Sequence, residues 1–328
     1  MITGKAVTIR EPGGPEVLAI QPFEVRDPGP GEVRVAVAAA GLNRADCLQR
    51  KGVYPAPPGY PDAVPGLELA GTVEAVGEGV RAFAEGDRVM AIIGGGGMAT
   101  HAVLHERELL PVPEGMTLTD AAAIPEVFLT AWDALFPQAE LRMGETLLVH
   151  AIASGIGTAA LQLAQAVGAT VIGTSRSQAK LDRCAELGLE HGVETSDGSF
   201  VEGVKALAPG GVDVILDTIG AKYLRENLKV AAPRGRVVTI GLLGGVKGEM
   251  NLGLMLAKRL SWMGSVLRAR PLEEKGTLAQ AFRHQALPLF EAGRLKPIVD
   301  AVLPMADAAE AHRRMEASET FGKLVLAW

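Results

Sequence analysis

A run of small residues between an apolar stretch and a helical pattern could bind a phosphate. The run is Ala151-Ile152-Ala153-Ser154-Gly155-Ile156-Gly157, and it follows the apolar residues Leu147-Leu148-Val149 of a predicted strand at 145–150. A dinucleotide-binding turn uses three glycines to bend, to approach the pyrophosphate and to pack its helix on its strand. In this sequence Ala151 occupies the position of the first glycine. Because the N–H groups and dipole of a helix N-terminus favour anions, we expect Ala153, Ser154, Gly155, Ile156 and Gly157 to contact a phosphate. The alternative is an ordinary strand-to-helix turn.

The end of the next predicted strand carries hydroxyl and cationic side chains. Its sequence is Thr174-Ser175-Arg176-Ser177, with Lys180 soon after. A site for NAD has a carboxylate here for the ribose 2′-hydroxyl, and this stretch has none. Since Thr174, Ser175, Arg176 and Lys180 can donate to a 2′-phosphate, we expect NADPH rather than NADH. The alternative is a solvated turn with incidental positive charge.

The elements that would position these residues alternate between strand and helix. Apolar runs at 145–150, 170–173, 212–217 and 236–240 predict strands, and residues 156–167, 178–187 and about 222–231 predict helices. This alternation indicates an α/β fold with a parallel sheet covered on both faces.

The chain before this block has a different pattern. Short apolar or alternating runs at 5–9, 32–37 and 71–76 lie between glycines and prolines and predict strands. Residues 323–326 are strand-like again. We therefore expect a first domain at 1–122, a dinucleotide-binding domain at 123–266 and a segment at 267–328 that returns to the first domain.

Composition excludes several classes of protein. A formal charge of -6 without a basic block argues against nucleic-acid binding. The apolar stretches are broken well before the ~18 residues of a membrane span, and residues 1–14 lack a secretory apolar core, so we expect a cytoplasmic location. Two cysteines, Cys47 and Cys184, are too few for a disulfide framework or a four-cysteine zinc lobe.

Several segments taken together resemble a known family. They are Gly41-Leu42-Asn43-Arg44-Ala45-Asp46, Pro65-Gly66-Leu67-Glu68-Leu69-Ala70-Gly71, Gly86-Asp87-Arg88-Val89, Ala122-Ala123-Ile124-Pro125, the 151–157 turn and Gly322-Lys323-Leu324-Val325. The set resembles the zinc-free quinone oxidoreductases of the medium-chain dehydrogenase/reductase superfamily, in particular the tumour-suppressor-inducible type. The resemblance implies a GroES-like, partly open β-barrel domain and a Rossmann domain with a doubly wound parallel sheet, with cofactor and substrate in a cleft between them.

The resemblance also argues against a metal. Zinc-dependent relatives have a cysteine and a histidine at the positions held here by Asn43 and Leu67, although Glu68 remains. His101 and His105 do not replace them, because four residues along a strand span about 13 Å. We therefore expect no catalytic zinc, and interpret Glu68 as a buried, paired carboxylate rather than a reacting group.

By resemblance, two residues are candidates for catalysis. Asn43 would offer an amide N–H to a developing oxyanion beside the nicotinamide. Tyr54 would be a hydrogen-bond or proton donor, and its alternative role is an aromatic lid in a proline-rich loop. Further positions that would line the cofactor are Thr130, Gly241, Leu242, Leu243, Ser265, Leu267 and Lys323; for Leu267 a packed core role is the alternative.

These inferences favour an NADPH:quinone reductase that transfers hydride or single electrons. An enoyl-type reductase acting on an α,β-unsaturated ketone or thioester is the first alternative, and a non-catalytic NADPH-binding protein is the second. A homodimer is the family expectation, and the apolar run Leu260–Val266 could supply a sheet edge for it; the alternative is an interior strand. The sequence does not identify the quinone.

Overall fold

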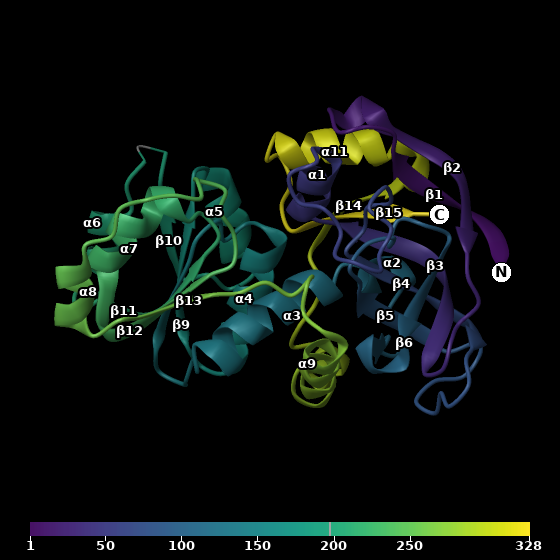
Figure 1. Ribbon diagram of the computed structural model, residues 1–328. Helices are drawn as coiled ribbons and strands as arrows, with labels where there is room; N and C mark the ends of the chain where they lie inside the picture. Colours follow the sequence, from purple (N-terminus) through teal and green to yellow (C-terminus); the bar gives the residue numbers. More distant parts are fainter. Residues whose placement is uncertain (197) are drawn as a thin grey trace. The chain divides into compact units, whose positions relative to one another are not determined.

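The computed structural model describes residues 1–196 and 198–328, which form two compact units. The first unit contains Met1–Leu129 and Leu267–Trp328, and the second contains Thr130–Val266 (Figure 1). The middle unit thus begins at Thr130 rather than at the expected residue 123. The division falls inside helix α3 (Pro125–Asp133).

The first unit is built mainly on antiparallel strands, as expected for a GroES-like domain. Strands β1 (Ile2–Ile9) and β2 (Leu18–Val25) form a hairpin-like pair. The larger sheet has the order β14-β15-β3-β4-β5-β7, and β6 also pairs with β3. Its strands are β3 (Glu32–Leu42), β4 (Glu68–Val76), β5 (Arg88–Ile92), β6 (His101–His105), β7 (Leu109–Pro111), β14 (Val299–Pro304) and β15 (Lys323–Ala327).

The C-terminal strand β15 joins distant parts of the chain. It pairs antiparallel with β3, with Leu324 opposite Leu42, and parallel with β14. Leu42, Leu324 and Leu326 are fully buried in one core cluster. The lysine that precedes Leu324 is therefore held beside the end of β3.

Short helices cover this unit. They are α1 (Arg44–Arg50), α2 (Leu118–Ala121), α9 (Leu272–Gln285), α10 (Leu287–Glu291) and α11 (Ala308–Glu316), with 3-10 turns η1 (Pro15–Val17), η2 (Glu106–Glu108) and η5 (Met305–Asp307). Helix α9 packs on η2, which follows β6 directly.

The second unit is the predicted parallel sheet with helical crossovers. Its strand order is β10-β9-β8-β11-β12-β13, and every pairing is parallel. The strands are β8 (Thr146–Val149), β9 (Thr170–Ser175), β10 (His191–Glu194), β11 (Val212–Asp217), β12 (Ala231–Thr239) and β13 (Ser261–Gly264). The order changes direction around β8 and β11, as in a doubly wound sheet. The fold class inferred from the sequence is confirmed.

The helices of this unit follow the strands in turn. They are α4 (Gly155–Ala166), α5 (Gln178–Ala185), α6 (Val201–Leu207), α7 (Leu224–Val230) and α8 (Leu252–Lys258), with a π-helical turn η3 (Ala134–Gln138) and a 3-10 turn η4 (Ala221–Tyr223). Apolar side chains of the strands, such as Leu148, Ile215 and Val237, are buried in one cluster. Among the described residues, no helix is long and apolar enough to span a bilayer.

Candidate functional site

The small-residue turn follows β8 and bends at a residue that is not glycine. Ala151 has a φ of 51°, in the left-handed region that an alanine adopts only at a cost. The bend is held by hydrogen bonds from Ile152 N to Thr174 O (3.0 Å) and from Ser154 N to Ala151 O (2.9 Å). Ala151 therefore makes the turn that the first glycine of such a motif usually makes.

Gly157 meets the close-packing requirement of the same motif. A Cβ at this position would lie 2.3 Å from the carbonyl oxygen of Ile152. The side chain of Ser154 caps α4, since its Oγ accepts from Gly157 N at 3.1 Å. Within the described residues, the amides of Gly155 and Ile156 have no backbone acceptor. The turn thus presents unused N–H groups at a helix N-terminus, and these fit a pyrophosphate.

The end of β9 lies beside this turn. Ser175 Oγ accepts from Ser177 N at 3.2 Å, and Arg176 is exposed to solvent. Lys180 lies in the first turn of α5. Thr174 is buried and its hydroxyl contacts His150, so its side chain is already occupied. Of the residues expected to bind a 2′-phosphate, Arg176 is the most accessible cation.

His150 directly precedes the turn and holds it by side-chain hydrogen bonds, a role that was not predicted from the sequence. It is fully buried, with Nδ1 at 3.0 Å from Thr174 Oγ1 and Nε2 at 2.8 Å from Asn227 Oδ1. Burial lowers the pKa of His150 to about 4. The ring is therefore neutral and joins β8, β9 and α7. The sequence feature that could have predicted this role is a histidine at the end of an apolar run, directly before the turn.

Apart from Thr130, the other predicted positions of this unit follow the carboxyl ends of strands, where open α/β sheets bind ligands. Gly241, Leu242 and Leu243 follow β12, and both leucines are about half exposed. Ser265 follows β13, donates to Asp133 Oδ2 (3.0 Å) and accepts from Gln138 Nε2 (2.8 Å). Thr130 is half-buried in α3.

Asp217 ends β11 and shapes the neighbouring loop. Its Oδ1 accepts from the backbone N–H groups of Ile219 (2.8 Å) and Gly220 (3.0 Å). Gly220 has a φ of 77°, which suits glycine. The carboxylate therefore fixes the loop after β11.

In the first unit, Asn43, Glu68 and Lys323 form a buried cluster. The Lys323 ammonium donates to Leu42 O (2.9 Å), Asn43 Oδ1 (2.8 Å) and Glu68 Oε1 (2.5 Å). Lys323 is 3% exposed and Glu68 is 0% exposed. Glu68 is thus a buried, paired carboxylate, as interpreted from the sequence, and Lys323 supplies its counter-charge.

The amide of Asn43 is already engaged in this cluster. Its Nδ2 donates to Glu68 Oε1 at 2.9 Å and to Gly41 O at 3.3 Å. Donation to an oxyanion, as expected from the resemblance, would require the longer bond to Gly41 to be given up. The observed role of Asn43 is to connect β3 with Glu68 and Lys323.

Two further carboxyl groups, those of Asp46 and Glu126, belong to residues that are hydrogen-bonded to this cluster. Asp46 Oδ1 accepts from Gly66 N and Oδ2 from Asn43 N, both at 2.8 Å, and burial raises the pKa of Asp46 to about 6. Glu126 donates its backbone N–H to Glu68 Oε2 at 2.8 Å. Its own buried Oε2 has no partner among the described residues, and burial together with Glu68 raises the pKa of Glu126 to about 8. Glu126 is therefore protonated at neutral pH.

Tyr54 lies under a buried arginine. The Arg268 guanidinium is 5.1 Å from the centre of the Tyr54 ring and donates to Tyr54 O (3.1 Å), Gly94 O (2.7 Å) and Gln49 Oε1 (2.5 Å). Burial raises the pKa of Tyr54, so its hydroxyl is protonated. Leu267, which directly precedes Arg268 in the sequence, is 5% exposed and packs like a core residue.

The residues of this cluster do not fit a zinc ion. Asn43 and Leu67 stand where zinc-dependent relatives would have ligands, and the ammonium of Lys323 already neutralises Glu68. In the described part of the chain, no group of three histidine, cysteine, aspartate or glutamate side chains could hold a metal. His101 and His105 lie on strand β6, as predicted. Cys47 is buried, and burial raises the pKa of its thiol to about 12.

Segments of this chain match two known protein families. Residues 29–114 match the alcohol dehydrogenase GroES-like domain, and residues 155–283 match the family described as zinc-binding dehydrogenase. The second description fits the fold, whereas the side chains around Glu68 do not fit the metal.

Curated relatives align with nearly the whole chain. A quinone oxidoreductase of Pseudomonas aeruginosa is 37% identical over 320 residues, covering 96% of each protein. A synaptic vesicle membrane protein VAT-1 homolog of Rattus norvegicus is 34% identical over 315 residues, covering 91% of this chain and 77% of the relative.

Solved structures agree with the fold of the whole chain. One described as an NAD-dependent alcohol dehydrogenase has a TM-score of 0.88 and 36% identity, and covers 99% of both chains. The apo JamJ enoyl reductase has a TM-score of 0.88 and 27% identity at the same coverage. With the GroES-like unit, the parallel-sheet unit and these full-length relatives, the chain belongs to the quinone oxidoreductases of the medium-chain dehydrogenase/reductase superfamily.

Proposed function

We propose that this protein is a zinc-independent, NADPH-dependent quinone reductase. The observation that carries the proposal is the buried Lys323 ammonium, held by Leu42 O, Asn43 Oδ1 and Glu68 Oε1. The Lys323 ammonium occupies Glu68 Oε1 and would repel a zinc ion placed beside this carboxylate. An enzyme without a Lewis acid is suited to a substrate that accepts hydride readily, such as a quinone.

The second unit carries the proposed cofactor residues. The open amides of Gly155 and Ile156 would hold the pyrophosphate, and Ser175 and Arg176 would hold the 2′-phosphate. The two leucines after Gly241 and the side chain of Ser265 would line the adjoining strand ends. NADPH, when bound, supplies the hydride that reduces the quinone.

The first unit would control charge and protons around the acceptor. Reduction of a quinone to a hydroquinone by hydride also consumes a proton. Protonated Tyr54 is a donor for it, and water is an alternative source. Asn43 and Lys323 hold the carboxylate of Glu68 in place by hydrogen bonds to its Oε1.

The test is oxidation of NADPH and of NADH, measured separately with an ortho-quinone, a para-quinone and an enone, in the presence of a chelator. We expect quinone-dependent oxidation that strongly favours NADPH and is insensitive to the chelator. Loss of activity with the chelator would overturn zinc independence, and equal use of NADH would overturn the cofactor assignment. Binding of NADPH without turnover of any acceptor would support a non-catalytic protein instead.

An enoyl-type reductase is the second candidate, because the JamJ enoyl reductase has a fold of the same type over the full chain. The same hydride donor would then act on an α,β-unsaturated carbonyl. Faster turnover of the enone than of both quinones would favour this candidate.

We also propose a homodimer formed through the edge of the parallel sheet. Strand β13 lies at the end of the strand order, and Leu252 and Leu256 of the preceding helix are 63% and 76% exposed. Exposed sheet edges and apolar residues favour pairing. Light scattering after size-exclusion chromatography should give twice the mass of the chain for the wild type. The variant Leu256→Glu should have the mass of a monomer. A monomeric wild type would contradict the proposal.

A further inference from the structure

The segment that carries Tyr54 has no regular secondary structure of its own. It connects the end of α1, at Arg50, to the start of β4, at Glu68, and residues 51–67 contain no helix or strand. Connections of this length are uncommon in compact domains and are usually functional. Tyr54 is half-buried in this segment. The contacts that hold the segment in one conformation therefore decide where the Tyr54 hydroxyl lies.

Arg268 reaches this segment from a distant part of the sequence. It is the second residue of the first unit after the chain returns from the second unit at Leu267, and it is 3% exposed. Its guanidinium donates to three oxygens, which are Tyr54 O at 3.1 Å, Gly94 O at 2.7 Å and Gln49 Oε1 at 2.5 Å. One side chain thus connects the Tyr54 segment to α1 and to the loop after β5.

Gln49 extends this connection to the second half of the segment. Its Nε2 donates to Asp62 O at 2.8 Å, and Asp62 Oδ1 accepts from Ala56 N at 2.8 Å. The first bond holds the second half of the segment to α1, and the second bond closes the turn formed by residues 56–62. Arg268 and Gln49 together therefore hold both halves of the segment.

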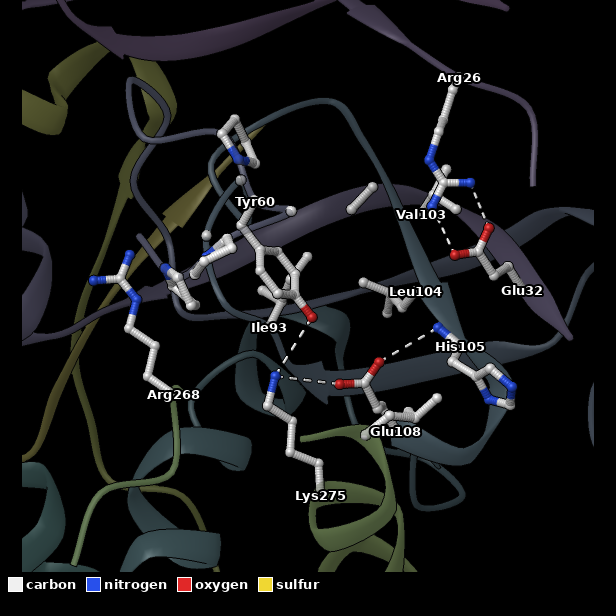
Figure 2. A pocket seen from close by; sticks show the side chains of 18 of the residues that line it. Arg26, Glu32, Tyr60, Ile93, Val103, Leu104, His105, Glu108, Arg268 and Lys275 are labelled. Atoms are coloured by element: carbon white, nitrogen blue, oxygen red, sulfur yellow. Dashed lines mark hydrogen bonds and ion pairs between the residues drawn. The ribbon is translucent and has the colours of Figure 1, made fainter. Parts of the chain in front are cut away.

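The charge of Arg268 has no ion-pair partner among the described residues, since its three acceptors are uncharged oxygens. Arg268 also lines a cavity of about 560 Å³ in the first unit (Figure 2). On the lining of this cavity, Glu32 pairs with Arg26. Glu108 pairs with Lys275, and Figure 2 shows no ion pair from either carboxylate to Arg268. A buried charge without an ion pair is costly, which indicates a role that a neutral side chain could not fill.

Two properties of arginine fit this position. The planar guanidinium has five N–H groups in fixed directions, and three of them meet the diverging acceptors. Its carbon also lies 5.1 Å from the centre of the Tyr54 ring, where a cation is attracted to the aromatic face. Lysine would supply the charge without the fork, and methionine would supply neither.

The same charge acts on the Tyr54 hydroxyl. Burial raises the pKa of Tyr54, and the positive charge of Arg268 opposes this rise, whereas a negative charge on Glu126 would add to it. A nearby cation stabilises the phenolate. Arg268 therefore makes loss of the phenol proton easier than burial alone would allow.

We propose that Arg268 is a positioning residue for Tyr54, which it holds by the backbone carbonyl and by the face of the ring. This inference rests on the proposed function, in which Tyr54 donates the proton that accompanies the hydride. The Tyr54 O–H bond would break as this proton passes to the reduced acceptor, and water would return a proton to the phenolate. Arg268 acts only through Tyr54.

The first test measures the Tyr54 segment without turnover. Hydrogen exchange of the full chain, measured by mass spectrometry, follows residues 51–64, in which the amides of Val53, Ala56 and Tyr60 are hydrogen-bonded. Arg268→Met should raise the exchange rate of this segment about tenfold or more, because local opening becomes easier. Unchanged exchange of this segment in folded Arg268→Met would overturn the proposal.

Arg34→Met is the matched control. Arg34 is a buried arginine of β3 in the same unit, and it pairs with Asp27 and Glu74. Its replacement should leave the exchange of residues 51–64 and the turnover number unchanged. Equal increases in exchange for Arg34→Met and Arg268→Met would overturn the proposal, because they would show a loss of stability of the whole unit.

The second test asks whether Arg268 acts through Tyr54. With NADPH and a quinone, Tyr54→Phe and Arg268→Met should each lower kcat about tenfold or more, with KM for NADPH nearly unchanged. The double variant should be no slower than Tyr54→Phe, since both changes remove the same proton donor. Additive losses in the double variant, or full activity of Tyr54→Phe, would overturn the proposal.

Arg268→Lys separates the charge from the fork. A single ammonium keeps a cation near the ring but cannot serve three diverging acceptors at once. We therefore expect kcat between those of Arg268→Met and the wild type, and faster exchange of residues 51–64 than in the wild type. Wild-type exchange and kcat in Arg268→Lys would contradict the role of the guanidinium geometry.

The two measurements separate this inference from the proposed function. Normal quinone turnover in folded Arg268→Met would support the reductase and overturn the positioning role. Exchange of residues 51–64 that depends on Arg268, in a wild type that oxidises no NADPH with any quinone, would overturn the reductase and leave Arg268 as the residue that holds Tyr54.

Discussion

At the scale of single residues, the main feature of the first unit is the buried ion pair between Lys323 and Glu68. Lys323 and Glu68 lie 255 positions apart in the sequence and meet because β15 pairs with β3 beside β4. The sequence alone suggested that Glu68 was paired, but it could not name the partner, since the partner depends on strand order. It also could not show that both polar ends of Asn43 are occupied.

Removing the partner of Glu68 should destabilise the first unit. Lys323→Met leaves a buried carboxylate without a counter-charge, which costs about 3–5 kcal/mol. The double variant Lys323→Met/Glu68→Gln should recover most of this loss. Urea unfolding of Lys323→Met, Glu68→Gln and the double variant measures the coupling free energy of the pair. Additive losses of unfolding free energy would show that the two residues do not act as a unit.

Arg176 and Lys180 should determine the preference between the two dinucleotides. Replacing both with alanine removes the cationic side chains near the end of β9 and should weaken NADPH binding tenfold or more, with little effect on NADH. Fluorescence titration with each dinucleotide measures the two affinities. Equal losses for both would contradict a 2′-phosphate site there.

At the scale of elements, the strand-turn-helix unit around Ala151 was the most predictable part of the chain. An apolar run, a turn of small residues and a helical apolar face identified β8, α4 and β9 to within a few residues. Strand β10, His191–Glu194, was not predicted because only Val193 among its residues is buried. Its extended form depends on pairing with β9, and such a contact is invisible in a local pattern.

The bend at Ala151 predicts a stabilising substitution. Ala151→Gly removes the cost of a left-handed alanine and should raise the free energy of unfolding by up to about 1 kcal/mol. NADPH affinity should change little, because the backbone already has the required shape. Chemical denaturation gives the first quantity and titration the second; a destabilised variant would show that the methyl group of Ala151 contributes packing that outweighs the strain.

At the scale of the whole molecule, two buried groups should give pH dependences of opposite sign, one in each unit. Burial lowers the pKa of His150 from 6.5 to about 4, so the unfolded chain binds more protons between these values. Stability from neutral His150 is therefore complete above pH 6.5 and declines as pH falls towards 4, by about 3 kcal/mol in total. Burial raises the pKa of Glu126 from 4.5 to about 8, so its contribution declines as pH rises between these values.

The measurement is the free energy of unfolding at several pH values for the wild type, His150→Gln and Glu126→Gln. Relative to the wild type, His150→Gln should lose less stability on acidification from pH 6.5 to 4, and Glu126→Gln should lose less on moving from pH 5 to 8. Parallel curves for the three proteins would show that neither group titrates with the shifted pKa.

The order of the chain also differs from the order in which its units can be completed. The parallel-sheet unit is one continuous segment, whereas the first unit needs β15, from the last residues of the chain, between β3 and β14. During synthesis the middle segment can therefore fold while the N-terminal strands still lack a neighbour. Until β15 arrives, residues 39–42 of β3 lack this partner strand, and Glu68 lacks the ammonium of Lys323. Strand β15 thus completes both the backbone sheet and the charge balance of the first unit.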